Sequence, residues 1–213
     1  MGFGLLFIGY IFFLYVLPVG TQFLSVASAI LLLALYKLSR YHAGFRRAAY
    51  LSALLLFLGL PSLLSTLLGV SFPSELYTAF AAAAWAILVV FHLLTFGAIA
   101  ELAKRTKLFR LEVAATQNRL FSAVFCVLLL LNELLTLPLI SRLPETDANR
   151  ILIYILIGKA VLGLIIVGLN LVMLYSAYMR FCQPGQEQRG VHEYEQLFGA
   201  KDKDKPSGRG NDK

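Results

Sequence analysis

The stretch LLLLNELLTLPLI, residues 128–140, places the carboxylate of Glu133 inside an apolar run. Asn132 precedes Glu133, and leucines flank the two polar residues on both sides. A long apolar run with so few charges is typical of a helix that crosses a membrane. A charge inside the hydrocarbon costs at least about 2.5–3.5 kcal/mol. The stretch therefore predicts a membrane helix and a neighbouring group that neutralises Glu133.

The composition of the whole chain supports a membrane protein. Of the 213 residues, 59% are apolar and 15% are charged, and the mean hydropathy is +0.75. Soluble domains are about 45–50% apolar and about 25% charged. The apolar runs are longer than the roughly ten-residue alternating strands of an outer-membrane barrel. These features predict an all-α, polytopic integral membrane protein.

Six apolar runs predict a six-helix transmembrane bundle of three hairpins. The predicted spans are residues 3–17, 21–36, 48–70, 75–100, 120–140 and 151–178. The first two are near the lower limit of about 17 residues for a span, so a single re-entrant hairpin is the alternative. Pro18 and Gly20 predict a tight turn between them, and Pro61 predicts a kink in the third span. The segment SVASA (25–29) resembles a signal-peptide cleavage site, but the N-terminus lacks the usual positive charge.

The distribution of basic residues predicts the orientation. The segments KLSRYHAGFRR (37–47) and ELAKRTKLFRLEVAATQNR (101–119) together carry nine Lys and Arg residues. The alternate connections, VLPVG (16–20), SFPSE (71–75) and SRLPETDANR (141–150), carry two arginines. The positive-inside rule places the basic segments in the cytoplasm. An even number of spans then places both termini in the cytoplasm, with the protein in the plasma membrane.

The C-terminal tail forms the second part of the predicted organisation. Residues 1–180 make the six-helix transmembrane domain, and residues 181–213 a cytoplasmic tail. The tail beyond Ala200 is too polar to bury a core, so we expect it to be largely disordered. Either a solubilising or a partner-binding role fits this composition.

Lys159 is the predicted neutralising group for Glu133. The fifth and sixth spans are antiparallel, so Glu133 lies roughly 10 Å and Lys159 roughly 12 Å from the outer boundary, at about 1.5 Å per residue. We therefore predict that the two side chains face each other or a common polar cavity. The pair either fixes helix packing or binds an ion, a proton or a polar substrate.

Other polar residues in the spans extend this candidate intramembrane site. His92 shares a helix face with Trp85 and Thr95. The imidazole of His92 either packs between helices or carries a proton. Asn170 shares a face with Lys159 and Gly163, which predicts an inward polar stripe. The candidate site consists of Glu133, Lys159, Asn132, His92 and Asn170.

No catalytic, cofactor-binding or metal-binding motif is recognisable in the sequence. His42, His92 and His192 lie in three separate segments, so no metal site and no cofactor are predicted, and a conventional enzyme is not favoured. Cys126 and Cys182 predict two reduced thiols. The net charge of +7 comes from residues flanking the helices, which argues against a nucleic-acid partner.

The segments FIGYIFFLYVLP (7–18) and ALYKLSRYHAGFRRAAYLSALLL (34–56) resemble small multi-pass membrane proteins of clostridial-type Gram-positive bacteria. The shared pattern is a short first helix, a Leu-Pro turn and a KLS segment followed by phenylalanine and basic residues. That family is uncharacterised, so the resemblance implies a membrane architecture and a localisation but no activity.

Three functions remain open. The first is an accessory or scaffold protein that acts through helix and tail contacts, with a membrane protein or a second copy as partner. The second is a small transporter or channel that uses Glu133 and Lys159. The third is a membrane-embedded lipid-modifying enzyme with His42, Glu101 and basic residues near the inner headgroups. A well-packed bundle without a continuous cavity favours the first function, and a polar cavity that reaches Glu133, Lys159 and His92 favours the second.

Overall fold

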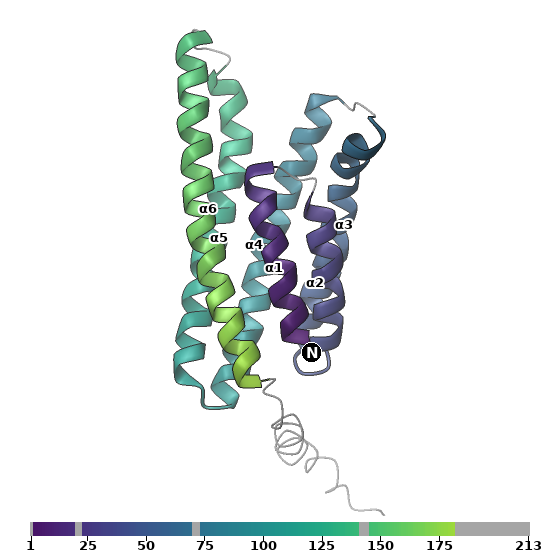
Figure 1. Ribbon diagram of the computed structural model, residues 1–213, viewed down its shortest axis with the longest axis vertical. Coiled ribbons are helices and arrows are strands. Elements are labelled where there is room, and N and C mark those ends of the chain that lie inside the picture. The colour runs from purple at the N-terminus through teal and green to yellow at the C-terminus, as the bar shows by residue number, and fades with distance from the viewer. Residues whose placement is uncertain (1, 20–22, 70–72, 141–144, 182–213) are drawn as a thin grey trace, which may run out of the picture.

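The computed structural model describes residues 2–19, 23–69, 73–140 and 145–181, and these residues form six α-helices and no strand. The helices are α1 (Gly2–Val19), α2 (Leu24–Leu38), α3 (Ala43–Leu68), α4 (Ser74–Arg105), α5 (Phe109–Ile140) and α6 (Glu145–Phe181). They run side by side as three antiparallel hairpins (Figure 1). The predicted all-α bundle is confirmed.

Four of the helices, α3 to α6, are long and apolar enough to cross a membrane. Helices α1 and α2 are apolar but shorter, with 18 and 15 residues. At 1.5 Å per residue they are about 27 and 22 Å long, less than the roughly 30 Å of a hydrocarbon core. The structure therefore supports a membrane protein with four long apolar helices.

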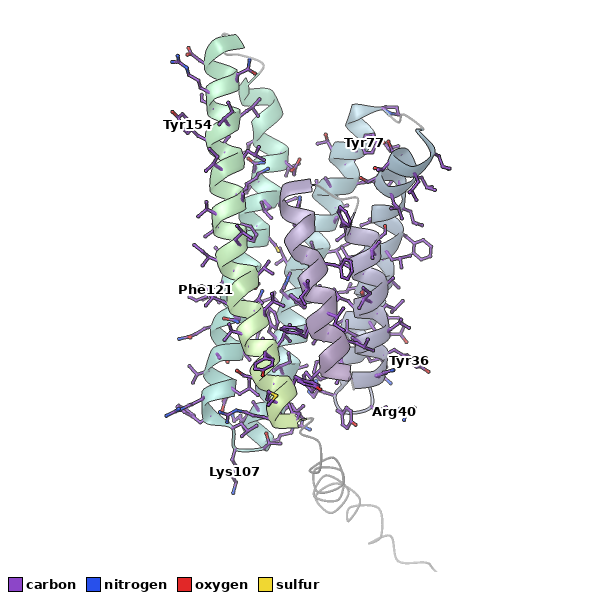
Figure 2. The ribbon with its side chains drawn as sticks, viewed as in Figure 1. Tyr36, Arg40, Tyr77, Lys107, Phe121 and Tyr154 are labelled. Atoms are coloured by element: carbon purple, nitrogen blue, oxygen red, sulfur yellow. The ribbon has the colours of Figure 1, made fainter. Side chains whose placement is uncertain are left out.

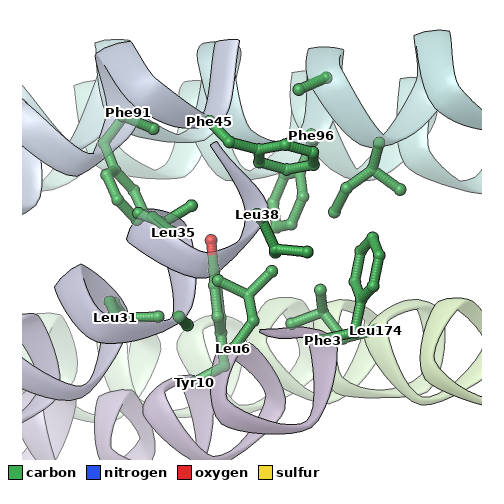
Figure 3. Packing of buried hydrophobic residues seen from close by; sticks show 14 of the residues in the cluster. Phe3, Leu6, Tyr10, Leu31, Leu35, Leu38, Phe45, Phe91, Phe96 and Leu174 are labelled. Carbon is green, nitrogen blue, oxygen red and sulfur yellow. The ribbon is translucent and has the colours of Figure 1, made fainter. Parts of the chain in front are cut away.

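The six helices close into a ring. Each helix packs against its neighbours in the sequence, and α6 also packs against α1. Large buried side chains fill the inside of the ring (Figure 3). They include Leu6, Tyr10, Leu31, Leu35, Phe45, Phe91, Phe96 and Leu174, each no more than 1% exposed. We call this packed assembly the helix ring.

The start of α1 and the end of α6 meet at one end of the bundle. The rings of Phe3 and Phe181 stack there with centroids 5.2 Å apart. The turns after α2 and α4 lie at the same end, as the positions of Arg40 and Lys107 in Figure 2 show. The two basic segments thus lie together with both ends of the helical region. We call this end, with residues 37–47 and 101–110, the basic end.

The helices extend beyond several predicted boundaries. The basic segment 101–119 is helical on both sides of a short turn. Helix α4 continues to Arg105 and α5 begins at Phe109, with a turn at Lys107 in the left-handed region (φ 57°). Helices α5 and α6 begin before the predicted spans at residues 120 and 151, because hydropathy marks the apolar part of a helix and not its hydrogen-bonded ends.

Proline does not end α1 at Pro18 or α3 at Pro61. Helix α1 continues past Pro18 to Val19, whereas the predicted span ends at residue 17. Helix α3 runs through Pro61 and ends before Gly69, whose φ of +66° is the left-handed cap that glycine adopts without strain. The bend predicted at Pro61 stays a prediction. Of the predicted tail, residues 181–213, only Phe181 is described, as the last residue of α6, and the rest lies outside the described residues.

Helix α6 is the longest element, with 37 residues. At 1.5 Å per residue it is about 55 Å long. At the end opposite the basic end, its first turns reach past the ends of the other helices (Figure 1). We call the halves of α5 and α6 at that end, residues 128–140 and 145–162, the projecting hairpin.

Candidate functional site

Glu133 and Lys159 form an ion pair in the projecting hairpin. The Lys159 Nζ lies 3.6 Å from the Glu133 Oε1, and the side chains are 26% and 29% exposed, respectively. The distance is longer than a hydrogen bond, so the contact is mainly electrostatic. The predicted pairing of these two residues is confirmed.

A second polar contact joins the same two helices nearer the basic end. The Asn170 Nδ2 donates a hydrogen bond to the Ser122 Oγ at 2.8 Å, and both side chains are buried. The Asn118 Nδ2 donates to the Leu169 carbonyl oxygen at 2.9 Å. These hydrogen bonds attach α6 to α5 inside the helix ring.

The two polar pairs are in register. Ser122 and Glu133 are eleven residues apart on α5, and Asn170 and Lys159 are eleven residues apart on α6. Eleven residues make about three helical turns, so each helix presents both polar groups on one face. By the same register, Ile140 at the end of α5 lies near the level of residue 152. The first turns of α6, which carry Asp147 and Arg150, therefore project past α5.

The inward stripe predicted on α6 is present. Its buried positions are Gly163, Ile166, Val167, Asn170, Met173, Leu174 and Ala177, which recur every three or four residues. Lys159 lies on the same face one turn before Gly163, where it is half-buried. Asn132 is half-buried next to Glu133.

His92 lies in the helix ring and not in the projecting hairpin. Its Nδ1 donates to the Leu88 carbonyl oxygen at 2.7 Å, which leaves Nε2 as the acceptor of the neutral ring. The Sγ of Cys126 lies 3.7 Å from the same Nδ1. The aromatic rings of Tyr10, Phe13, Phe91 and Phe96 surround the imidazole with centroids 5.5–6.3 Å away.

A small cavity of about 30 Å³ lies next to His92. Its lining comes from α1, α4, α5 and α6 and consists of Tyr10, Phe13, Trp85, Leu88, His92, Ser122, Phe125, Cys126, Ile166, Val167 and Asn170. His92 and Asn170 of the predicted site therefore meet here, whereas neither Glu133 nor Lys159 lines this cavity. The five predicted residues form two separate polar sites.

Sequence reasoning did not select Tyr10 and Ser122, which also line the cavity. Ser122 lies three turns before Glu133 on α5, a periodicity that could have indicated it. Tyr10 lies in an apolar run with several aromatic residues, and nothing in the local pattern sets it apart. The place of Tyr10 in the cavity wall depends on the packing of α1 against α4, where Tyr10 contacts His92 and Phe96.

A third polar cluster lies at the basic end. The His42 Nδ1 accepts from the Gly44 backbone N–H at 3.0 Å and caps the start of α3. The neutral ring then carries its proton on Nε2, which donates to the Glu101 Oε2 at 2.9 Å. Arg105 donates to the other carboxylate oxygen of Glu101. Both imidazole nitrogens are therefore engaged in a clamp between α3 and α4.

Within the described ranges, no three His, Cys, Asp or Glu side chains come close enough to hold a metal ion. Comparisons with known proteins do not indicate a family or a function for this chain. No protein-family model, no curated protein and no solved structure matches this chain.

Proposed function

We propose that this chain is a multi-pass accessory or scaffold protein that acts through contacts of its helices and its C-terminal tail. The observation that carries the proposal is the direct contact of Glu133 with Lys159 at a place that the cavity does not reach. A pair in direct contact sets the register of two helices, as polar contacts between membrane helices do. The filled helix ring also fits a packed protein better than a conducting one.

The same proposal includes six spans and a plasma-membrane location. Helices α1 and α2 are short for a bilayer, and local thinning accommodates short spans at a modest free-energy cost. The basic end faces the cytoplasm under the positive-inside rule, with both termini there. The resemblance of residues 7–18 and 34–56 to clostridial-type membrane proteins agrees with a bacterial plasma membrane.

Helix α6 supplies the proposed contact surface. It is the least buried of the four long helices, because only 11% of its most apolar 18-residue stretch is buried inside the protein. Its exposed apolar side chains include Ile153, Leu156, Ile157, Val161, Leu164 and Ile165. Without a hydrophobic driving force in lipid, such a face binds a partner helix by van der Waals packing. The partner is a membrane protein or a second copy of this chain.

Site-specific photocrosslinking in the native membrane tests the contact surface. A photoreactive phenylalanine analogue replaces Ile157 on α6 and, as a matched control, Phe57 on α3, which is also exposed. We expect a discrete protein adduct from position 157 and mainly lipid adducts from position 57. An adduct of twice the mass of the chain identifies a second copy. Lipid adducts alone at both positions would contradict the scaffold proposal.

The transporter alternative predicts a solute path past Glu133 and Lys159. Flux of protons, potassium and chloride into vesicles that contain the purified chain tests it directly. We expect no flux above that of protein-free vesicles. Flux that disappears in the double variant Glu133→Gln/Lys159→Met would replace the scaffold proposal with this alternative.

The lipid-enzyme alternative rests on the contact of His42 with Glu101 at the basic end. A general base needs a free nitrogen, and the His42 Nδ1 already caps α3. This cluster therefore supports a structural clamp. Turnover of a labelled phospholipid that is lost in His42→Gln would support the enzyme alternative.

A further inference from the structure

Two buried polar atoms without a hydrogen-bond partner belong to residues that line the same cavity. Tyr10 is 1% exposed and Asn170 is 2% exposed. Among the described residues, neither the Tyr10 hydroxyl nor the Asn170 Oδ1 has a partner. Exchanging the oxygen and nitrogen of the Asn170 amide would still leave one of its two atoms unpaired, because Ser122 engages a single side of the group.

An unpaired polar atom is costly inside a membrane protein. Burial of a hydroxyl or an amide without a compensating hydrogen bond is unfavourable in any apolar medium. In a bilayer core, no bulk water is available to relieve the cost. Two such atoms on one cavity therefore indicate a bound molecule that pairs with both.

The size and the lining of the cavity define the molecule. A water molecule needs about 10–15 Å³ of such space and two to four polar partners. The cavity of about 30 Å³ has room for one or two. The residues that line it carry the hydroxyl groups of Tyr10 and Ser122, the carboxamide of Asn170 and the imidazole of His92, which together supply donors and acceptors. No Asp, Glu, Lys or Arg lines it, so an ion has no counter-charge there.

We propose that this cavity is an internal water site in which one or two bound water molecules join the Tyr10 hydroxyl to the Asn170 carboxamide. The water connects α1 to α6 across the helix ring, where the two helices close it. It also completes a polar network that includes Ser122 on α5 and His92 on α4. The site is separate from the Glu133–Lys159 pair and does not depend on the scaffold function.

The sign of a change in thermal stability tests the water site. Tyr10→Phe removes one hydroxyl and keeps the ring. Thr95→Val is the matched control, because the Thr95 hydroxyl is also buried without a partner among the described residues but does not line the cavity. In lipid nanodiscs we expect Tyr10→Phe to lower the midpoint Tm and Thr95→Val to raise it or leave it unchanged. A rise in Tm for Tyr10→Phe would overturn the proposal, because removal of an unpaired hydroxyl stabilises a protein.

A second measurement on the unaltered chain covers the case in which Tyr10→Phe does not fold. Brief X-ray radiolysis converts bound water to hydroxyl radicals, which modify neighbouring side chains, and mass spectrometry locates them. We expect Tyr10 to be modified several-fold faster than Phe45, which is equally buried but does not line the cavity. Asn170→Leu should reduce the modification of Tyr10. Equal rates at Tyr10 and Phe45 would overturn the proposal.

Discussion

The helix ring and the projecting hairpin use the same kinds of residue and pack them differently. In the ring, Leu174 of α6 is fully buried. In the projecting hairpin, Leu156 of the same helix is 57% exposed. Large aromatic and aliphatic side chains hold the ring together, whereas the Glu133–Lys159 ion pair joins the two helices of the projecting hairpin.

The difference shows what polar residues do in a membrane helix. Where neighbouring helices surround α6, shape and van der Waals contact are sufficient to fix its position. Where α5 and α6 leave their neighbours, few packing contacts remain. Under the scaffold proposal, the charge pair at that height fixes the register, because separating the two charges in a low-dielectric medium is costly. Four pairs of variants test this comparison.

The largest effect should come from Leu174→Ala in the ring. Truncation of a buried leucine leaves a cavity and costs about 3 kcal/mol in unfolding free energy. Leu164→Ala on the same helix is the control, since Leu164 is 55% exposed and should change stability by less than about 0.5 kcal/mol. Titration of unfolding with a denaturing detergent measures both. Equal losses would mean that a second protein covers the exposed face of α6.

The next effect should come from Glu133→Leu in the projecting hairpin. The variant leaves Lys159 without its partner, and an isolated charge in the bilayer costs about 2.5 kcal/mol. Glu133→Leu/Lys159→Leu removes both charges and should recover most of the lost unfolding free energy. A double variant no more stable than Glu133→Leu would show that the two groups act independently.

Gly59→Ala probes the close approach of α3 to α2 in the ring. A Cβ at position 59 would lie 2.9 Å from the backbone nitrogen of Ser25 and 2.5 Å from its Oγ. Because backbone yields little, we expect a loss of about 1–3 kcal/mol in unfolding free energy. At Gly168 on α6 a Cβ meets nothing within 4 Å. Gly168→Ala should therefore be neutral or stabilise the helix by up to about 1 kcal/mol, and the same detergent titration compares the two.

The smallest effect should come from Asn118→Ala, which removes the hydrogen bond to the Leu169 carbonyl oxygen. Interhelical hydrogen bonds in membranes contribute about 0.6 kcal/mol on average, so a loss of that size is expected. Gln117→Ala is the control, because Gln117 is exposed on the same turn. A loss of unfolding free energy well above 2 kcal/mol would mean that this hydrogen bond, rather than packing, holds α6 against α5.

Much of the candidate site could be predicted because its residues are rare in their surroundings. Glu133 and Lys159 are charges within apolar runs on consecutive helices, and their similar depth was enough to predict contact. Asn170 was predictable as part of a three-turn stripe with Lys159. The separation of His92 from this pair was not predictable, because helix spacing gives the face of a residue but not the neighbour that the face meets.

The membrane class, the helical content and the pairing of Glu133 with Lys159 could be predicted from the sequence alone. These follow from local composition and from the antiparallel order of consecutive helices, which short connections enforce. The tertiary structure decided that α6 closes on α1, that Tyr10 and Asn170 line one cavity, and that the projecting hairpin stands apart from the ring. These depend on which helix faces meet, and that choice depends on the fit of side chains distant in the sequence.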